Sequence, residues 1–186
     1  MANTVTNVST GRPATGGAIS VAPTTATLPT DATTALASTF EGLGYVGEDG
    51  LTNTNTASSE LVKAWGGDTV LNLQTEKPDT FTFKLLEVLN VNVLKAVYGD
   101  SNVSGAIDTG ITVTANSKEL PDKAWVFDMV MRNGVLKRIV LPVARITEVA
   151  DIVYSDSDAV AYEVTVQAFP DGSGNTHYEY IKKPVA

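Results

Sequence analysis

Apolar and polar side chains alternate through residues 60–87, and this alternation predicts consecutive β-strands. Two runs carry the pattern, "TVLNLQTE" at 69–76 and "DTFTFKLLE" at 79–87. One face of these strands would carry Leu71, Leu73, Thr75, Phe81, Phe83 and Leu85. The opposite face would carry Val70, Asn72, Gln74, Glu76, Thr80, Thr82 and Lys84. One apolar and one polar face indicate an antiparallel sheet that covers a core on one side and meets water on the other.

Short turn signals separate these strands. Gly66 and Gly67 can take the positive φ angles that a tight hairpin needs. The sequence Lys77-Pro78-Asp79 predicts a second turn, because proline presets the φ angle of its first central position. Such a long β-ribbon requires a pairing partner.

The remaining chain is also rich in strand patterns, and it has one clear helix. "NVNVLKAVYG", residues 90–99, predicts a helix that Asn90 or Asn92 caps and Gly99 ends. Further strands are expected in "GITVTA", "KAWVFDMVMR", "VLKRIVLP", "RITEVADIVY", "AVAYEVTVQAF" and "THYEYI". Hairpin turns are predicted at residues 132–134 and 171–175. The fold class is therefore mainly β: an antiparallel β-sandwich or barrel with one short flanking α-helix.

Residues 1–40 differ in composition from the rest of the chain. They are rich in Thr, Ala, Gly, Ser and Pro, and they cannot build a core of their own. We expect an extended N-terminal arm with a short strand at 16–23 and a short helix near 31–40. Residues 41–186 would then form a single sandwich or barrel domain with a long polar loop at about 47–59.

Composition narrows the possible functions. The chain has no cysteine, which excludes disulfides, thiolate metal sites and cysteine nucleophiles. Its formal net charge of −8 disfavours a protein that grips the nucleic-acid backbone. No apolar run approaches the length of a membrane span, and the first residues lack the features of a secretory signal.

No catalytic, cofactor-binding or metal site is expected from the sequence motifs. "GRPATGGA" lacks the Lys and Ser/Thr of a phosphate-binding loop. The alternating Asp171, Ser173 and Asn175 lack the glycine and the glutamate of a calcium loop, and a turn explains them better. Asp156 and Asp158 are expected to be solvated, and Ser173 lacks the context of a nucleophile elbow.

The single histidine, His177, has no second histidine with which to bind a metal. Trp65 and Trp125 each follow "KA", and large aromatic residues in such places are usually core or interface anchors. The sequence therefore favours a protein that assembles with other chains, because a polar arm, a long loop and a ribbon with open edges all require external partners.

Several stretches carry a resemblance to a known family. They are "LGYVGEDGLTN", "VKAWGGDTVLNLQTE", "FKLLEVLNVNVLKAVYG" and "ITEVADIVYSDSDAVAYEVTVQAFPDGSGN". From about residue 16 to residue 181 the chain resembles the major tail protein, or tail tube protein, of long-tailed, non-contractile phages of actinobacteria. The resemblance implies a structural virion protein that is not an enzyme and has no cofactor. It would be assembled in the host cytoplasm and located in the virion tail.

The resemblance also implies how copies would assemble. Six copies would form a ring whose β-hairpins pool into an inner barrel, and the rings would stack around a tape-measure protein. Tail terminator and tail-tip proteins would be further partners, and phage DNA would pass through without sequence-specific binding or any membrane contact. The terminal arm and residues 51–59 would bridge neighbouring rings.

Two groups of residues are expected to carry these contacts. The predicted lumen residues are Asn72, Gln74, Glu76, Thr80 and Thr82, with Asp128 and Asp151 as further additions. The predicted subunit-interface residues are Trp65, Gly66, Gly67, Leu51, Thr52 and Asn53.

Two other functions stay open at this point. One is a monomeric carbohydrate-binding β-sandwich that uses Trp65 or Trp125 as a stacking platform. The other is a hydrolase with an acidic pair such as Asp156 and Asp158.

Overall fold

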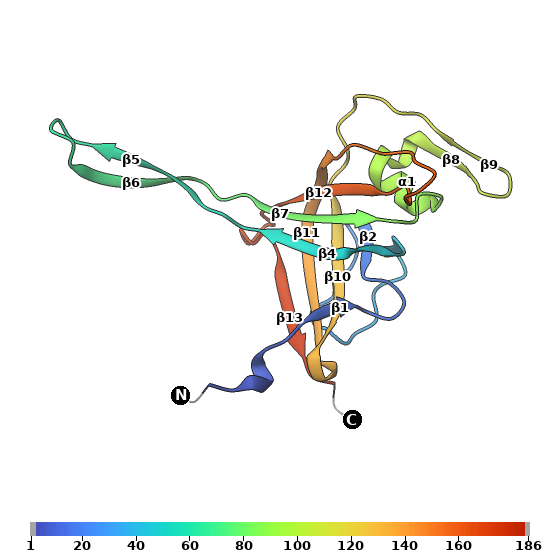
Figure 1. The fold of residues 1–186 in the computed structure, drawn as a ribbon, viewed down its shortest axis with the longest axis horizontal. Helices are drawn as coiled ribbons and strands as arrows, with labels where there is room; N and C mark the ends of the chain where they lie inside the picture. The colour runs from blue at the N-terminus through green and yellow to red at the C-terminus, as the bar shows by residue number, and fades with distance from the viewer. Residues whose placement is uncertain (1–2, 185–186) are drawn as a thin grey trace.

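A computed structural model describes residues 3–184 and shows a mainly β protein (Figure 1). The strands are β1 (Gly11–Pro13), β2 (Ile19–Pro23), β3 (Glu41–Gly42), β4 (Val46–Thr54), β5 (Ser58–Lys63), β6 (Thr69–Glu76), β7 (Asp79–Leu85), β8 (Val103–Ala106), β9 (Gly110–Val113), β10 (Lys123–Met131), β11 (Leu136–Val149), β12 (Tyr162–Phe169) and β13 (Tyr178–Lys182). The helical elements are η1 (Val5–Asn7), α1 (Val91–Tyr98), η2 (Asp100–Asn102) and η3 (Arg132–Gly134).

One large antiparallel sheet forms the body. Its strand order is β3-β2-β10-β11-β12-β7-β4, with β1 paired to β10 and β13 paired to β11. In Figure 1, β4, β7 and β12 run across the direction of β10 and β11, so the sheet folds over into two layers. The sheet does not close into a barrel, and the predicted antiparallel sandwich with one α-helix is confirmed.

The core lies between these layers. Along β7, Phe81, Phe83 and Leu85 are buried and alternate with half-buried residues, as the sequence pattern predicts. The Phe127 ring lies 5.4 Å from that of Phe81 and 5.5 Å from that of Phe83, and Trp125 extends the cluster. Aromatic packing of this kind stabilises a small core beyond the area it buries.

Helix α1 covers one side of this core. Asn90 caps it by accepting a hydrogen bond from the Asn92 amide at 3.0 Å, and Gly99 ends it with a φ of 96°. Val93, Leu94 and Val97 of the helix are buried, so α1 packs an apolar face on the core.

Strand β11 joins two stretches that the sequence pattern treats as separate strands. It continues through Pro142, which has no backbone N–H to donate to a neighbour. On one side, the β10 ladder shifts register between Lys123 and Trp125; on the other, β12 pairs only from Val143 onward. Both flanking ladders are interrupted beside the proline, which explains how a central strand accommodates it.

The two predicted hairpins have different outcomes. The turn at 132–134 joins the paired strands β10 and β11, with Asn133 at φ 61°, so that prediction is confirmed. The prediction for 171–175 is wrong, because β12 and β13 do not pair with each other. Instead, β12 and β13 pair one after the other with successive parts of β11, and residues 170–177 form a loop between them.

The N-terminal segment contributes to the body. The predicted strand near 16–23 is confirmed as β2, where Ile19 and Val21 are buried against the core. The helix expected near 31–40 is wrong, since those residues form bends and turns. Asp31 does cap the amides of Thr33 and Thr34, but the carbonyls of Asp31 and Thr34 accept hydrogen bonds from Arg138. In this structure these carbonyls accept from the Arg138 guanidinium, whereas in a helix they would accept from backbone amides four residues further on.

Candidate assembly surface

The most distinctive feature is a long two-stranded ribbon that leaves the body (Figure 1). Strand β4 leads into β5, and β6 leads into β7, so the base of the ribbon belongs to the large sheet and its far half projects. Every residue from 52 to 78 is exposed. The ribbon therefore buries nothing against its own subunit beyond its base.

This geometry corrects two sequence predictions. The long polar loop at about 47–59 is instead most of β4 followed by the start of β5. Residues 77–79 do not form a hairpin turn, because β6 continues into β7 without pairing to it. The polar composition of β4 is typical of a loop, but these residues form an exposed strand. The backbone hydrogen bonds of that strand are made by pairing with β7.

Strand register places different chemistry on the two faces of the projecting hairpin. Val62 lies opposite Leu71 and Glu60 lies opposite Leu73, so these four residues share a face. Val62, Leu71 and Leu73 are exposed by 40%, 48% and 46%, which leaves an apolar strip open to water. The prediction that this face covers the subunit's own core is wrong for residues 69–76, although the two-faced pattern itself is present.

The other face of the hairpin is mainly polar, although it also carries Leu61, which is exposed by 51%. Asn72 lies opposite Leu61, and Gln74 lies opposite Ser59. Glu76 lies opposite Ser58, beyond a register shift, and the Thr75 hydroxyl donates to the Ser58 carbonyl at 3.2 Å.

Threonines continue this polar character onto the body. The Thr82 hydroxyl lies 3.1 Å from that of Thr165 on β12, and the Thr80 hydroxyl donates to the Thr54 carbonyl at 3.4 Å. Because Phe81, Phe83 and Leu85 point into the core, Thr80 and Thr82 lie on the outer face of the sheet. The predicted lumen residues 72, 74, 76, 80 and 82 thus follow one another along a single strand path.

The tip of the hairpin presents a tryptophan. Gly66 and Gly67 have φ angles of 114° and 100°, as the turn requires, and the Ala64 amide donates to the Asp68 carbonyl at 2.8 Å. Trp65 has a relative exposure of 106%, so its indole contacts nothing substantial in its own subunit.

The other predicted assembly residues lie apart from the hairpin. Asp128 forms an ion pair with Arg138, Nε to Oδ1 at 2.7 Å, on the sheet face that faces residues 31–34. Asp151 is exposed just beyond the end of β11. On β4, Leu51 packs partly against the core and Thr52 is exposed, whereas Asn53 donates to Asp79.

The residues weighed for other chemistry have structural roles. Asp171 accepts hydrogen bonds from the Ser173 and Asn175 amides and from the Tyr178 hydroxyl. The Tyr178 hydroxyl is the main cause that holds the pKa of Asp171 below its ordinary value. His177 is bonded to Asp79, and no group of three or more potential metal ligands occurs within residues 3–184.

The two alternative functions lose part of their support. Trp125 is only 2% exposed, so it cannot form a sugar platform, and Trp65 is left as the remaining tryptophan for that role. Asp156 and Asp158 lie in an exposed bend, in which the Ser155 hydroxyl accepts from the Asp158 amide and Ser157 donates to the Asp158 carboxylate. Its exposure and its short-range hydrogen bonds are those of a solvated turn.

Other exposed apolar side chains are scattered along the chain and form no pattern in the sequence. They are Tyr45, Leu89, Ile107, Val153 and Tyr154, with relative exposures between 61% and 77%. Tyr45 directly precedes β4, Leu89 lies between β7 and α1, Ile107 follows β8, and Val153 and Tyr154 lie between β11 and β12. In Figure 1 these segments lie at the end of the molecule opposite the hairpin tip.

Comparisons with known proteins identify the family. The model of the family described as "Phage tail tube protein" matches residues 4–186, nearly the whole chain. No curated protein matches the chain in sequence. Among residues 3–184, no helix combines the length and the apolar character needed to cross a membrane.

Proposed function

This chain belongs to the phage tail tube protein family, a family of structural proteins of the virion tail, and we propose how its copies build the tube wall. The β5–β6 hairpins of neighbouring copies lie side by side and join into one continuous sheet around a channel. The observation that carries this proposal is the hairpin itself, which is fully exposed and has two different faces.

The free strand edges favour this arrangement. Within the described residues, β5 pairs with β6 alone and β4 pairs with β7 alone, so the β4–β5 edge and the β6 edge are both open. An open edge is a template for pairing with another chain. When β6 of one copy pairs with β5 of the next, the pairing stays antiparallel, and a closed ring of copies leaves no open edge.

The two faces then divide between channel and wall. The polar face with Asn72, Gln74 and Glu76, continued by Thr80 and Thr82, lines the channel. The apolar strip of Val62, Leu71 and Leu73 lies outward against the body of a neighbouring copy. This orientation removes the apolar strip from water, which is the favourable direction for association.

Six copies per ring and stacking of rings around a tape-measure protein complete the proposal, with terminator and tip proteins at the tube ends. A ring of six would carry a formal charge of six times −8, or −48. Acidic walls repel DNA phosphates, so the genome would slide through without adhering. The proposal assigns no catalytic role to any residue.

Electron microscopy tests this proposal directly. Purified protein is imaged in negative stain over a concentration series and its sedimentation is measured in parallel. Hollow rings or tubes are expected, because the open edges and the apolar strip favour association. Strictly monomeric particles at every concentration, also after tail tips are added as a template, would refute the proposal.

The carbohydrate alternative rests on Trp65 and has its own test. A sugar platform predicts a saccharide-dependent change in Trp65 fluorescence that is absent in Trp65→Phe. The tube proposal instead predicts that the fluorescence changes with protein concentration and not with saccharide.

A further inference from the structure

The ribbon leaves the body beside a buried carboxylate. Asp79 is the first residue of β7, directly after the exposed stretch 52–78, and it is only 1% exposed. It stands in phase with Phe81 and Phe83, so its side chain points toward the core. A buried carboxylate is costly unless hydrogen bonds or charges compensate it.

Three side chains from two other parts of the chain compensate Asp79. Asn53 Nδ2 of β4 donates to Oδ1 at 2.8 Å, and the Thr176 hydroxyl donates to Oδ2 at 2.6 Å. His177 Nδ1 lies 2.5 Å from the same Oδ2. Asn53 also donates to the Thr80 carbonyl at 3.1 Å, so it holds both strands of the ribbon at their base.

The balance of forces at Asp79 favours the ionised form. Burial raises its pKa, but the hydrogen bonds from Thr176, Asn53 and His177 and the charge of His177 together hold the pKa below its ordinary value. Each of these bonds is worth more than a bond between neutral groups, because one partner is charged.

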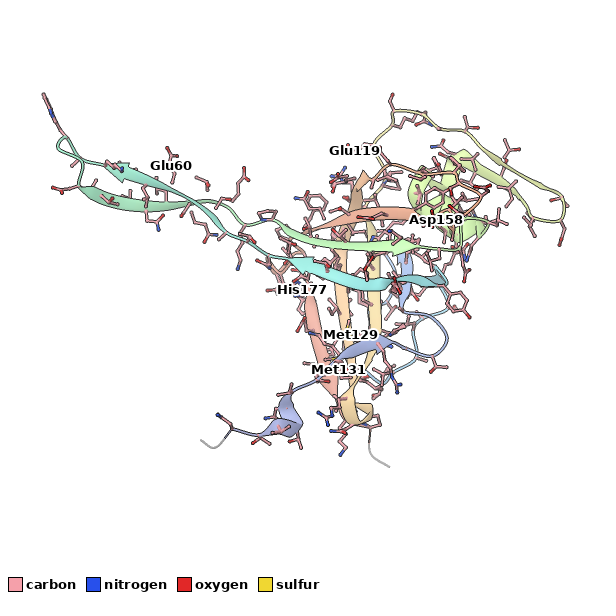
Figure 2. The ribbon with its side chains drawn as sticks, in the orientation of Figure 1. Glu60, Glu119, Met129, Met131, Asp158 and His177 are labelled. Atoms are coloured by element: carbon pink, nitrogen blue, oxygen red, sulfur yellow. The ribbon has the colours of Figure 1, made fainter. Side chains whose placement is uncertain are left out.

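Thr176 and His177 therefore link the 170–177 loop to the ribbon, and the rest of the loop is held by hydrogen bonds among its own residues. The His177 and Phe81 rings pack in a T-shaped arrangement with a centroid distance of 5.5 Å, so His177 contacts the core. Asp171 organises the remainder of the loop through Ser173, Asn175 and Tyr178 and makes no bond to the ribbon. Figure 2 shows His177 at the side of the body from which the hairpin projects.

We propose that Asp79 is a positioning residue for assembly, because it fixes the direction of the β5–β6 hairpin by joining β4, β7 and the 170–177 loop. The inference rests on the proposed function, since a hairpin must point in one direction to meet its neighbours around a ring. The loop acts as a brace: the ribbon cannot pivot at its base without separating a buried carboxylate from its donors. Breaking such a bond exposes the full desolvation cost of the charge.

Asp79→Asn tests the inference, and Asp171→Asn is its matched control. An amide at 79 has a single acceptor oxygen and no charge, so it cannot accept from Asn53, Thr176 and His177 together and forms no charge-assisted bonds. The control disturbs the same loop by the same chemical change without touching the ribbon. Thr176→Val is a second test variant that removes a single donor should Asp79→Asn fail to fold.

The absence of cysteine allows a clean readout of hairpin direction. Cysteines introduced at Asp68 on the hairpin and at Lys95 on α1 carry spin labels, and their distance distribution is measured by pulsed electron resonance on unassembled protein. The parent and Asp171→Asn should give a narrow distribution. Asp79→Asn and Thr176→Val should give a broadened or shifted one, and fewer tubes at equal protein concentration.

A distribution for both test variants as narrow as that of the parent would overturn the inference. So would equal broadening in Asp171→Asn, which would indicate general loosening of the loop. Because the labels report on single subunits, this result is independent of tube formation. Failure of the parent to form tubes would refute the proposed function and leave the distance result standing.

Discussion

Replacing the apolar strip of the hairpin should weaken assembly without weakening the subunit. The change is the triple substitution Val62→Thr, Leu71→Thr and Leu73→Thr. Threonine is favoured in strands, so the hairpin should still form. The three side chains cover none of the subunit's own core, and unfolding of the isolated subunit should therefore change little.

The size of the effect follows from the area still open to burial. Complete burial of a Val or Leu side chain contributes roughly 1.5–3 kcal/mol. The three residues keep 40%, 48% and 46% of their surface exposed in the isolated subunit. Burying the remaining exposed surface of each residue on assembly would contribute roughly 1 kcal/mol to the free energy of association. Because a threonine in the same place still buries part of that apolar surface, the triple variant should lose about 2 kcal/mol per hairpin. The concentration needed for assembly should rise about thirtyfold.

Sedimentation across a concentration series measures that threshold, with circular dichroism to check the fold. Asn72→Thr with Gln74→Thr is the matched control, since it places the same residue type on the opposite face of the same strand. The control should assemble near the parent's concentration. Assembly of the triple variant at an unchanged threshold would refute the outward placement of the strip.

Three further predictions concern charged groups. Arg138→Met leaves Asp128 partly buried without its partner and frees residues 31–34, so urea unfolding should show a loss of about 3 kcal/mol; an unchanged midpoint would contradict this role. Because the folded-state pKa of Asp79 is depressed, its contribution to stability is present above the unfolded pKa of ~4 and is lost as pH falls. Melting temperatures between about pH 5 and pH 3 should consequently fall less steeply in Asp79→Asn than in the parent, and parallel curves would count against it. Glu76→Lys should still form tubes but slow DNA ejection from phage that carry it; unchanged ejection would exclude Glu76 from the lumen.

Local pattern was sufficient for much of the fold. Alternation identified β7, and capping chemistry identified α1 between Asn90 and Gly99. The turn at Asn133 also determines the register of β10 and β11, since residues at equal distances before and after Asn133 lie opposite each other. Asp128 and Arg138 are such a pair, and their ion pair could have been found from the sequence.

What the sequence could not provide depends on distant segments. Asp79 stands in phase with the core positions of β7, which is a readable sign of burial. Its donors, however, come from Asn53 and from residues 176–177, far away along the chain. The helix expected near 31–40 failed for the same reason, because Arg138 lies more than a hundred residues beyond the carbonyls that it binds. The series arrangement of β12 and β13 along β11 likewise has no local signature.

The order in which strands meet also has a consequence for synthesis. Strand β2 pairs with β10, so an N-terminal strand must wait for residues 123–131 before its backbone is satisfied. Pairings of such long sequence separation form slowly, whereas β10 and β11 are joined by a short turn. We expect the β10–β11 hairpin to nucleate folding, and pulse-labelled hydrogen exchange should protect its amides before those of β2; simultaneous protection would contradict this order. An emerging chain therefore exposes its apolar hairpin strip long before the body exists, and the growing polypeptide is vulnerable to premature association on the ribosome.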